Sequence, residues 1–278
     1  MLKVCTWNVN GLRKREAEVL EFMEREQPDV LCLQEIKAAS DQLPDALRVP
    51  AGYHAYLHGK PGYSGVALYM ARSAFPLRPA FRHPEFDHET RIVTAEFPQF
   101  AIASIYVPNG GKDYQAKVRF LDALDAYAAL AQASGKALIL CGDLNVAREP
   151  RDVHPSQQNP RQLGQTPDER AQFERIVSRG LCDLSRLFHP DDDRLFTWWA
   201  PWRNQRERNI GWRIDYVLAS SSLSEHALGC ASQREFGTSD HGPLVATFSI
   251  DPPRSTVADP EPEPEPQPPP PSGQLTLF

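Results

Sequence analysis

Three features that would each assign the chain to a class of protein are absent from its 278 residues. No stretch comes near the roughly 20 consecutive apolar residues that a membrane-spanning helix needs. The five cysteines stand alone without a Cys-x-x-Cys pair, which argues against a disulfide framework or a zinc site. Basic side chains do not outnumber acidic ones, at 30 against 36, which excludes a protein that binds nucleic acid by positive charge alone.

The beginning of the sequence also lacks the pattern of a secretory signal. The segment MLKVCTWNVNG has no apolar core followed by a small-residue cleavage site. An odd number of scattered thiols is typical of proteins in a reducing compartment. We therefore expect a cytoplasmic protein without a membrane segment.

The acidic excess is concentrated in one proline-rich segment. Ten of the 26 prolines lie in residues 251–278 together with five acids and one arginine, so this segment carries −4 and residues 1–250 carry −2. Such a composition cannot bury a core. We expect a folded catalytic domain over residues 1–250, a disordered Pro/Glu-rich linker over 251–273 and a short peptide motif over 274–278.

Apolar runs predict more strands than helices in residues 1–250. Strands are expected at 2–9, 30–35, 65–70, 91–97, 100–107, 137–145, 214–220 and 244–250, and helices at 13–26, 114–133 and 166–179. The third helix begins with Thr166, Pro167 and Glu169, the pattern of a capping box with proline at the first helical position. Several strands follow one another without a helix, which predicts packed sheets flanked by helices.

Polar side chains occur where these apolar strands stop, within the apolar frame of one strand and just before the last one. They are Asn8, Glu35, Asn109, Asp143, Asn145, Asp215 and the pair Asp240-His241. Each alone has an ordinary explanation, because asparagine before glycine is commonly a turn residue and a carboxylate after a strand is commonly solvated. Together, carboxylates, amides and one histidine at one end of a sheet pack suit a divalent cation with oxygen ligands, such as Mg²⁺.

Six short segments carry a resemblance to a known family. WNVNG, QEIK, YVPNG, GDLN, GWRIDY and SDHGP occur in the order seen in the exonuclease III class of AP endonucleases, over roughly residues 2–250. GDLN and SDH alone would indicate only the wider endonuclease/exonuclease/phosphatase superfamily, whereas WNVNGLR and NIGWRIDY are much more specific for its DNA-repair branch. The resemblance implies an α+β fold, a four-layered α/β/β/α sandwich of two central sheets flanked by helices.

The resemblance also implies roles for the strand-end residues. Glu35 resembles the metal-binding glutamate, Asp143 the residue that activates water, and His241, held by Asp215, the donor to the phosphoryl oxygen. The implied catalytic set is Tyr106, Asp143, Asn145, Asp215 and His241. The implied metal-binding set is Asn8, Glu35, Asp143, Asn145, Asp240 and His241, with Mg²⁺ as the cofactor and Mn²⁺ able to substitute. A metal-free buried salt bridge is the alternative for the His241–Asp215 pair.

Four tryptophans and four arginines lie between residues 198 and 213. Core packing is the ordinary reason for a tryptophan, and we expect it for Trp199. The others, interleaved with arginines, suit a loop that lies on DNA and stacks into a gap. By resemblance, Trp198, Trp212 and Ile214 line a pocket for a flipped-out abasic sugar. The full set expected to contact DNA is Asn109, Trp198, Trp202, Arg203, Arg206, Trp212 and Ile214.

The implied function is metal-dependent cleavage of duplex DNA 5′ to abasic sites, with 3′–5′ exonuclease and 3′-end trimming activity. The expected substrate is duplex DNA with abasic sites or 3′ ends. We expect a monomer that is associated with the nucleoid in the cytoplasm. One alternative is a sister phosphodiesterase acting on RNA, inositol phosphate or lipid, which would have no need of the Trp/Arg segment. A catalytically inactive DNA-binding scaffold is the other, and the intact acids and histidine argue against it.

The residues 274–278 form a separate motif. Gln274, Leu275, Leu277 and Phe278 resemble the peptide that binds the bacterial DNA sliding clamp. An accidental apolar segment is the alternative, because short motifs give false matches. However, the motif is the only apolar cluster after residue 257, and a segment without a core has no packing reason to keep it. We therefore expect clamp binding through this peptide.

Overall fold

The computed structural model describes residues 1–254 of the chain, and its strands form two six-stranded sheets. In spatial order, the first sheet consists of β11 (Ala227–Ser232), β12 (Leu244–Phe248), β1 (Leu2–Asn8), β2 (Val30–Gln34), β4 (Tyr63–Ala71) and β3 (Tyr53–Lys60). The second consists of β5 (Ala80–Arg82), β6 (Ile92–Phe97), β7 (Phe100–Tyr106), β8 (Ala137–Asp143), β10 (Asp215–Ser220) and β9 (Leu181–Asp183).

Both sheets are mixed, and each has a parallel pair at its centre. β1 and β2 are parallel in the first sheet, as are β7 and β8 in the second, whereas the other neighbouring strands are antiparallel. A parallel pair needs a crossover connection, and a helix supplies it in both cases. The antiparallel pairs β3–β4 and β6–β7 need only short turns. Strands therefore follow one another without helices, as the sequence predicted.

The helices are α1 (Glu16–Glu26), α2 (Asp45–Arg48), α3 (Tyr114–Ala133), α4 (Pro167–Val177), α5 (Leu184–Phe188) and α6 (Ser221–Ser224). The predicted capping box at the start of α4 is confirmed. Thr166 Oγ1 accepts a hydrogen bond from the backbone N–H of Glu169 at 3.3 Å, and the Glu169 carboxylate accepts from the backbone N–H of Thr166 at 3.1 Å. Pro167 occupies the first turn, where its missing N–H costs nothing.

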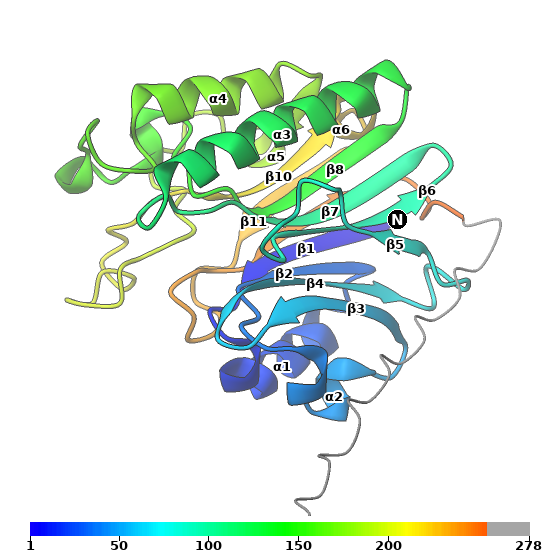
Figure 1. Ribbon diagram of the computed structural model, residues 1–278. Helices are drawn as coiled ribbons and strands as arrows, with labels where there is room; N and C mark the ends of the chain where they lie inside the picture. Colours follow the sequence, from blue (N-terminus) through cyan, green and yellow to red (C-terminus); the bar gives the residue numbers. More distant parts are fainter. Residues whose placement is uncertain (255–278) are drawn as a thin grey trace, which may run out of the picture.

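Figure 1 shows the four layers, with α1 and α2 on the outer face of the first sheet and α3 and α4 on the outer face of the second. The core between the sheets takes residues from both, including Val4, Cys32 and Val66 from the first and Ile102, Cys141 and Val217 from the second. Two further cores lie under the helices, around Phe22 and Leu31 on one side and Phe120 and Leu140 on the other. The predicted α/β/β/α sandwich is confirmed.

The strands at the sheet edges, β3, β5, β9 and β11, were not predicted from the sequence. β5 and β9 have three residues each, too few for a periodic pattern, and β3 carries two histidines and a lysine that mask its alternation. β11 is half exposed and contains glycine. The central strands were predicted because they are buried on both faces and read as continuous apolar runs.

The last strand, β12, ends at Phe248, next to the predicted domain boundary. The predicted peptide 274–278 and most of the predicted linker, from residue 255 onward, lie outside the described residues. Among the residues that are described, no helix is both long and apolar enough to cross a membrane.

Candidate active site

The predicted polar residues meet at one end of the two packed sheets. Asn8 ends β1, Tyr106 ends β7 and Asp143 ends β8, so three strands run toward this end. β10 runs in the opposite direction, and its first residue, Asp215, pairs with Asp143. His241 lies just before β12, which is antiparallel to β1. Residues far apart in sequence converge here because some strands end and others begin at the same place.

The amide of Asn8 joins two carboxylates from different sheets. Its Nδ2 donates to Glu35 Oε1 at 3.0 Å and to Asp143 Oδ2 at 2.9 Å. Its Oδ1 accepts from the backbone N–H of Asn10 at 3.0 Å, the contact of an Asx turn. The side chain is fully buried, so the amide fixes the spacing of the two acids without competition from water.

Glu35 belongs to a line of charged and polar groups that reaches Asp240. Lys37 Nζ lies 2.6 Å from both Glu35 Oε2 and Asn10 Oδ1, and Asn10 Nδ2 donates to Asp240 Oδ1 at 2.9 Å. Glu35 and Lys37 have positive φ angles of 52° and 50°, a region that few side chains adopt. Burial would raise the pKa of Glu35, but hydrogen bonds from Asn8 and Lys37 and the charge of Lys37 hold it below its ordinary value.

His241 is buried between carboxylates. Its Nδ1 lies 2.9 Å and 3.2 Å from the two oxygens of Asp215, whose Oδ2 also accepts from Thr197 Oγ1 at 2.6 Å. Burial alone would lower the pKa of His241, but the charge and hydrogen bond of Asp215 outweigh it and raise the pKa to about 10. The imidazole is therefore protonated near neutral pH, with Nε2 pointing away from Asp215 and 3.8 Å from Asp143 Oδ2.

Asp143 has the opposite electrostatic character from Glu35. It is almost completely buried, and its carboxylate accepts from the backbone N–H of Asn145 at 2.9 Å. Burial raises its pKa to about 7; the negative charges of Asp215 and Glu35 add to this, and the positive charge of His241 opposes it. Glu35 and Asp143 both accept a hydrogen bond from the Asn8 amide, yet their pKa values are shifted in opposite directions. This is the pattern of acids with different chemical roles.

The site fits a divalent metal. One ligand atom each from Glu35, Asp143 and His241 lie within 4.8 Å of one another. His241 is protonated and its Nδ1 is bound to Asp215, so the carboxylate oxygens of Glu35 and Asp143 remain as the ligands that a hard cation prefers. Asp240 lies outside this group and is linked to it through Asn10 and Lys37.

Tyr106 and Asn145 of the predicted catalytic set lie beside Asp143, and Asn109 of the predicted DNA-contacting set lines a hollow with Tyr106. Tyr106 pairs with Asp143 across β7 and β8, and burial together with the charges of Glu35 and Asp143 raises its pKa well above the ordinary value. Asn145 donates from Nδ2 to Val107 O at 2.9 Å and to Asp143 Oδ2 at 3.3 Å. Asn109 is exposed on a hollow of about 380 Å³ that Tyr106 also lines, and its Oδ1 accepts from the backbone N–H of Gly111 at 3.0 Å.

An apolar cluster adjoins His241. It consists of Ala147, Val153, Trp212 and Ile214, with Trp198 packed against it. The rings of Trp198 and Trp212 meet edge to face at 5.5 Å, and Trp198 lies 6.5 Å from the His241 ring. Trp198 Nε1 donates to Asp240 Oδ2 at 3.1 Å. The three residues predicted to line a sugar pocket therefore lie together and beside the catalytic candidates.

The arginines of this segment differ in what they contact. Arg206 donates from its guanidinium to four backbone carbonyls, those of Arg234, Phe236, Gly237 and Ser239, and stacks on Trp199 at 5.1 Å. Most of the five N–H donors of a guanidinium are thus used inside the protein. Trp202, 58% exposed, and Arg203 extend into solvent instead. The DNA contact of Arg206 stays a prediction, and in the structure its side chain holds segment 234–239 against the 198–213 segment.

Trp199 and Arg213 are structural. Trp199 is buried as predicted, and its Nε1 donates to Asn209 Oδ1 at 3.1 Å. Arg213 is fully buried between Asp152 and Asp183, with N–O distances of 2.8–3.0 Å. These contacts fix the backbone between Trp212 and Asp215.

Sequence reasoning gave no role to Lys37 or Thr197. Lys37 lies in the QEIK motif, two residues after Glu35, where a lysine beside a carboxylate could have indicated an ion pair. Thr197 carries no such signal, because its contact with Asp215 depends on two segments 18 residues apart.

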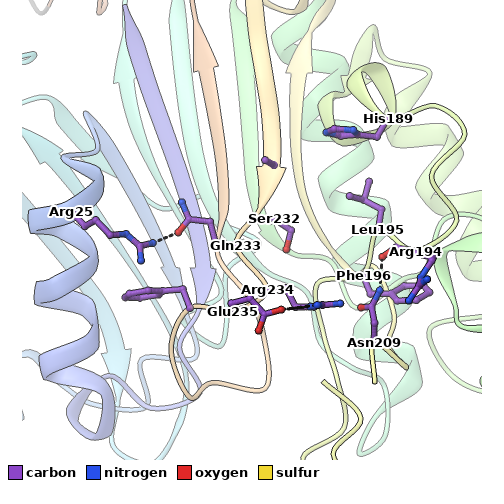
Figure 2. A pocket seen from close by; sticks show the side chains of 12 residues that line it. Arg25, His189, Arg194, Leu195, Phe196, Asn209, Ser232, Gln233, Arg234 and Glu235 are labelled. Atoms are coloured by element: carbon purple, nitrogen blue, oxygen red, sulfur yellow. Dashed lines mark hydrogen bonds and ion pairs between the residues drawn. The ribbon is translucent and has the colours of Figure 1, made fainter. Parts of the chain in front are cut away.

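A separate hollow of about 550 Å³ lies between α1 and the segments 194–196 and 231–236 (Figure 2). None of the predicted site residues within 1–254 lines it. Arg25 hydrogen-bonds to Gln233 at its rim, and Arg234 pairs with Glu235. The position of the candidate site therefore follows from the strand ends rather than from the size of a cavity.

Comparison with known proteins identifies the family of the chain. The family model described as the Endonuclease/Exonuclease/phosphatase family matches residues 5–241. The chain belongs to this family. Within it, the chain is 36% identical over 267 residues to the DNA repair nuclease APEX1 of Danio rerio, covering 90% of this chain and 83% of that protein. It is 33% identical to an exodeoxyribonuclease of Bacillus subtilis, covering 90% of this chain and all of that protein.

A further relative is longer than this chain. Recombination repair protein 1 of Drosophila melanogaster is 35% identical over 90% of this chain, which spans 37% of that protein. Among solved structures, an AP endonuclease from Archaeoglobus fulgidus has a TM-score of 0.80 and 32% identity, covering 90% of this chain and all of the other. A 3′ phosphatase, NExo, from Neisseria, bound to a product DNA hairpin, has a TM-score of 0.81 and 26% identity over 90% of this chain and all of that chain.

Proposed function

We propose that the chain is a metal-dependent DNA repair phosphodiesterase that cleaves duplex DNA 5′ to abasic sites and trims 3′ ends. The observation that supports it best is the arrangement of Asp143 and His241 at one strand end, with pKa values raised to about 7 and about 10. Relatives named as AP endonuclease and exodeoxyribonuclease support DNA as the substrate.

Asp143 is proposed to orient and deprotonate the attacking water. A carboxylate with a raised pKa is a stronger base than an ordinary one, and it stays ionised in part near neutral pH. Asn8 and Asn145 hold its oxygens by hydrogen bonds at 2.9 Å, so the carboxylate cannot rotate freely. The protonated His241, oriented by Asp215, is proposed to donate to the phosphoryl oxygen as charge develops there.

Glu35, with Asp143 beside it, is proposed to hold Mg²⁺, and Mn²⁺ can substitute. When bound, the metal neutralises charge on the non-bridging oxygens and the leaving O3′. Asn8 orients Glu35 toward the site, and Lys37 supplies a positive charge on the other carboxylate oxygen. Asp240, held by Asn10 and Trp198, is proposed as a further acid near the metal.

The test is incision of a duplex that contains a tetrahydrofuran site, alongside digestion of undamaged 3′ ends, with and without magnesium. Asp143→Asn should lower kcat about 10²–10⁴-fold while DNA binding persists, because removal of a general base has effects of this size. Asp122→Asn, on the exposed face of α3, is the matched control and should keep wild-type activity.

Near-normal turnover by Asp143→Asn would contradict the assignment of the base. Activity on RNA, inositol phosphate or lipid in place of the abasic duplex would contradict the substrate. The same preparations therefore separate the proposed function from its nearest relatives.

We propose in addition that Gln274, Leu275, Leu277 and Phe278 bind a bacterial sliding clamp, which would place the enzyme on DNA in the nucleoid. The support is the sequence motif alone, which follows a Pro/Glu-rich spacer. Such tethering raises the local concentration of enzyme without new contacts in the active site. Titration of purified clamp with the full chain, a 1–273 truncation and Leu277→Ala/Phe278→Ala tests it, and equal binding by all three would contradict it.

A further inference from the structure

A second group of metal-ligating side chains lies outside the active site. One ligand atom each from His58, His83 and Asp87 lie within 4.8 Å of one another. His58 Nε2 lies 2.7 Å from Asp87 Oδ2, and the rings of His58 and His83 stack at 4.6 Å with only 8° between their planes. None of these residues has a role in the proposed reaction.

The group joins the edges of the two sheets. His58 lies on β3, the last strand of the first sheet, and His83 directly follows β5, the first strand of the second. Two residues earlier on each strand, Tyr56 stacks on Phe81 at 5.3 Å. Two pairs of facing rings therefore connect strands that belong to different sheets, across the side of the sandwich.

The carboxylate of Asp87 is already oriented by the protein. Its side chain is fully buried, and Oδ1 accepts from the backbone N–H of Arg91 at 2.8 Å. Burial would raise the pKa of Asp87, but hydrogen bonds from His58 and from backbone N–H groups lower it below its ordinary value. A fixed, ionised carboxylate beside two imidazoles has the outer hydrogen bonds that ligating carboxylates need.

We propose that His58, His83 and Asp87 bind Zn²⁺, which ties the edge strands β3 and β5 together. Two imidazole nitrogens and one carboxylate are a donor set that zinc takes and magnesium does not favour. Tetrahedral zinc–ligand bonds of about 2.0–2.2 Å place two ligand atoms about 3.4 Å apart. His58 Nε2 and Asp87 Oδ2, 2.7 Å apart, must therefore separate slightly, and the His83 nitrogen, which lies within 4.8 Å of them, must reach the same metal. His83 is exposed, so its ring can turn to supply this movement, and water completes the tetrahedron.

Isothermal titration of the metal-stripped full chain with Zn²⁺, in excess magnesium to occupy the active site, tests the proposal. Wild type should bind one more Zn²⁺ than His83→Ala, and Asp87→Asn should weaken this site at least about tenfold. His88→Ala removes an imidazole from the same loop but not from the group, and it should bind as wild type does.

A second readout is thermal unfolding, because a metal that binds only the folded chain stabilises it. Zn²⁺ should raise the Tm of wild type and His88→Ala but leave that of His83→Ala unchanged. Equal zinc stoichiometry in wild type and His83→Ala, or an equal Tm shift, would overturn the proposal and leave His58 and Asp87 as an ion pair only. The outcome does not depend on nuclease activity.

Discussion

The strand-end site and the segment from Trp198 to Arg213 lie side by side, but they differ in what holds their side chains. In the site, polar side chains hold one another, as Asn8 holds Glu35 and Asp143. In the segment, buried residues are fixed by backbone carbonyls and ion pairs, whereas Trp202 and Arg203 extend into solvent. Residue type alone therefore does not tell which arginine is free to contact DNA. The hydrogen-bond acceptors around each guanidinium determine whether its donors are already used inside the protein.

Substitution of the buried Arg213 should have the largest effect on stability and so tests this difference most directly. Arg213→Ala should lower the free energy of unfolding by about 3–5 kcal/mol, because Asp152 and Asp183 would remain buried without their main partner. Chemical denaturation measures this, and the exposed Arg203→Ala is the matched control, with a change within about 0.5 kcal/mol. Equal stability of the two variants would show that the buried ion pairs do not hold the segment.

Arg206→Ala comes next and separates support from DNA contact. Removal of its hydrogen bonds to four backbone carbonyls should cost about 1–3 kcal/mol of stability, because those carbonyls are left without a charged donor. The salt dependence of DNA binding should stay that of wild type, because the guanidinium is engaged with the protein's own backbone rather than with phosphate. A shallower salt dependence with unchanged stability would instead support the DNA contact that the sequence predicts for Arg206.

The same contrast shows what the sequence could and could not predict. Apolar runs that end in Asn8 and Asp143 or begin at Asp215 predicted central strands and a polar edge, since burial on both faces leaves a continuous pattern. The positive φ of Glu35 and the contact between Thr197 and Asp215 had no local signal, because they depend on segments that meet only in the folded chain. The hydrogen bonds of Arg206 to backbone carbonyls had no local signal for the same reason, since the acceptors lie about 30 residues further along.

Trp212→Ala tests the apolar cluster beside His241. It should reduce affinity for an abasic duplex about tenfold more than affinity for intact duplex, if only the flipped sugar packs against this ring. Because Trp212 is buried, stability will also fall, so the ratio of the two affinities of the folded variant is the quantity to measure. The control is Trp202→Ala, on the exposed part of the segment, which should reduce the affinity for both duplexes equally. If Trp212→Ala also reduced both affinities equally, the pocket hypothesis would be wrong.

The smallest expected effect concerns the exposed arginines. Arg203→Ala should weaken all duplexes only a few fold, because one phosphate contact carries no sequence or lesion information. The diagnostic quantity is the slope of log K against log salt, which should become shallower by about 0.9 for each phosphate that the protein no longer neutralises. Arg48→Ala on α2, which covers the outer face of the first sheet, removes the same charge elsewhere and should leave the slope unchanged (Figure 1). If Arg203→Ala and Arg48→Ala gave the same slope as wild type, the exposed arginine would not bind phosphate. Among the exposed side chains of the segment, Trp202 and Arg208 would then be the next candidates for DNA contact.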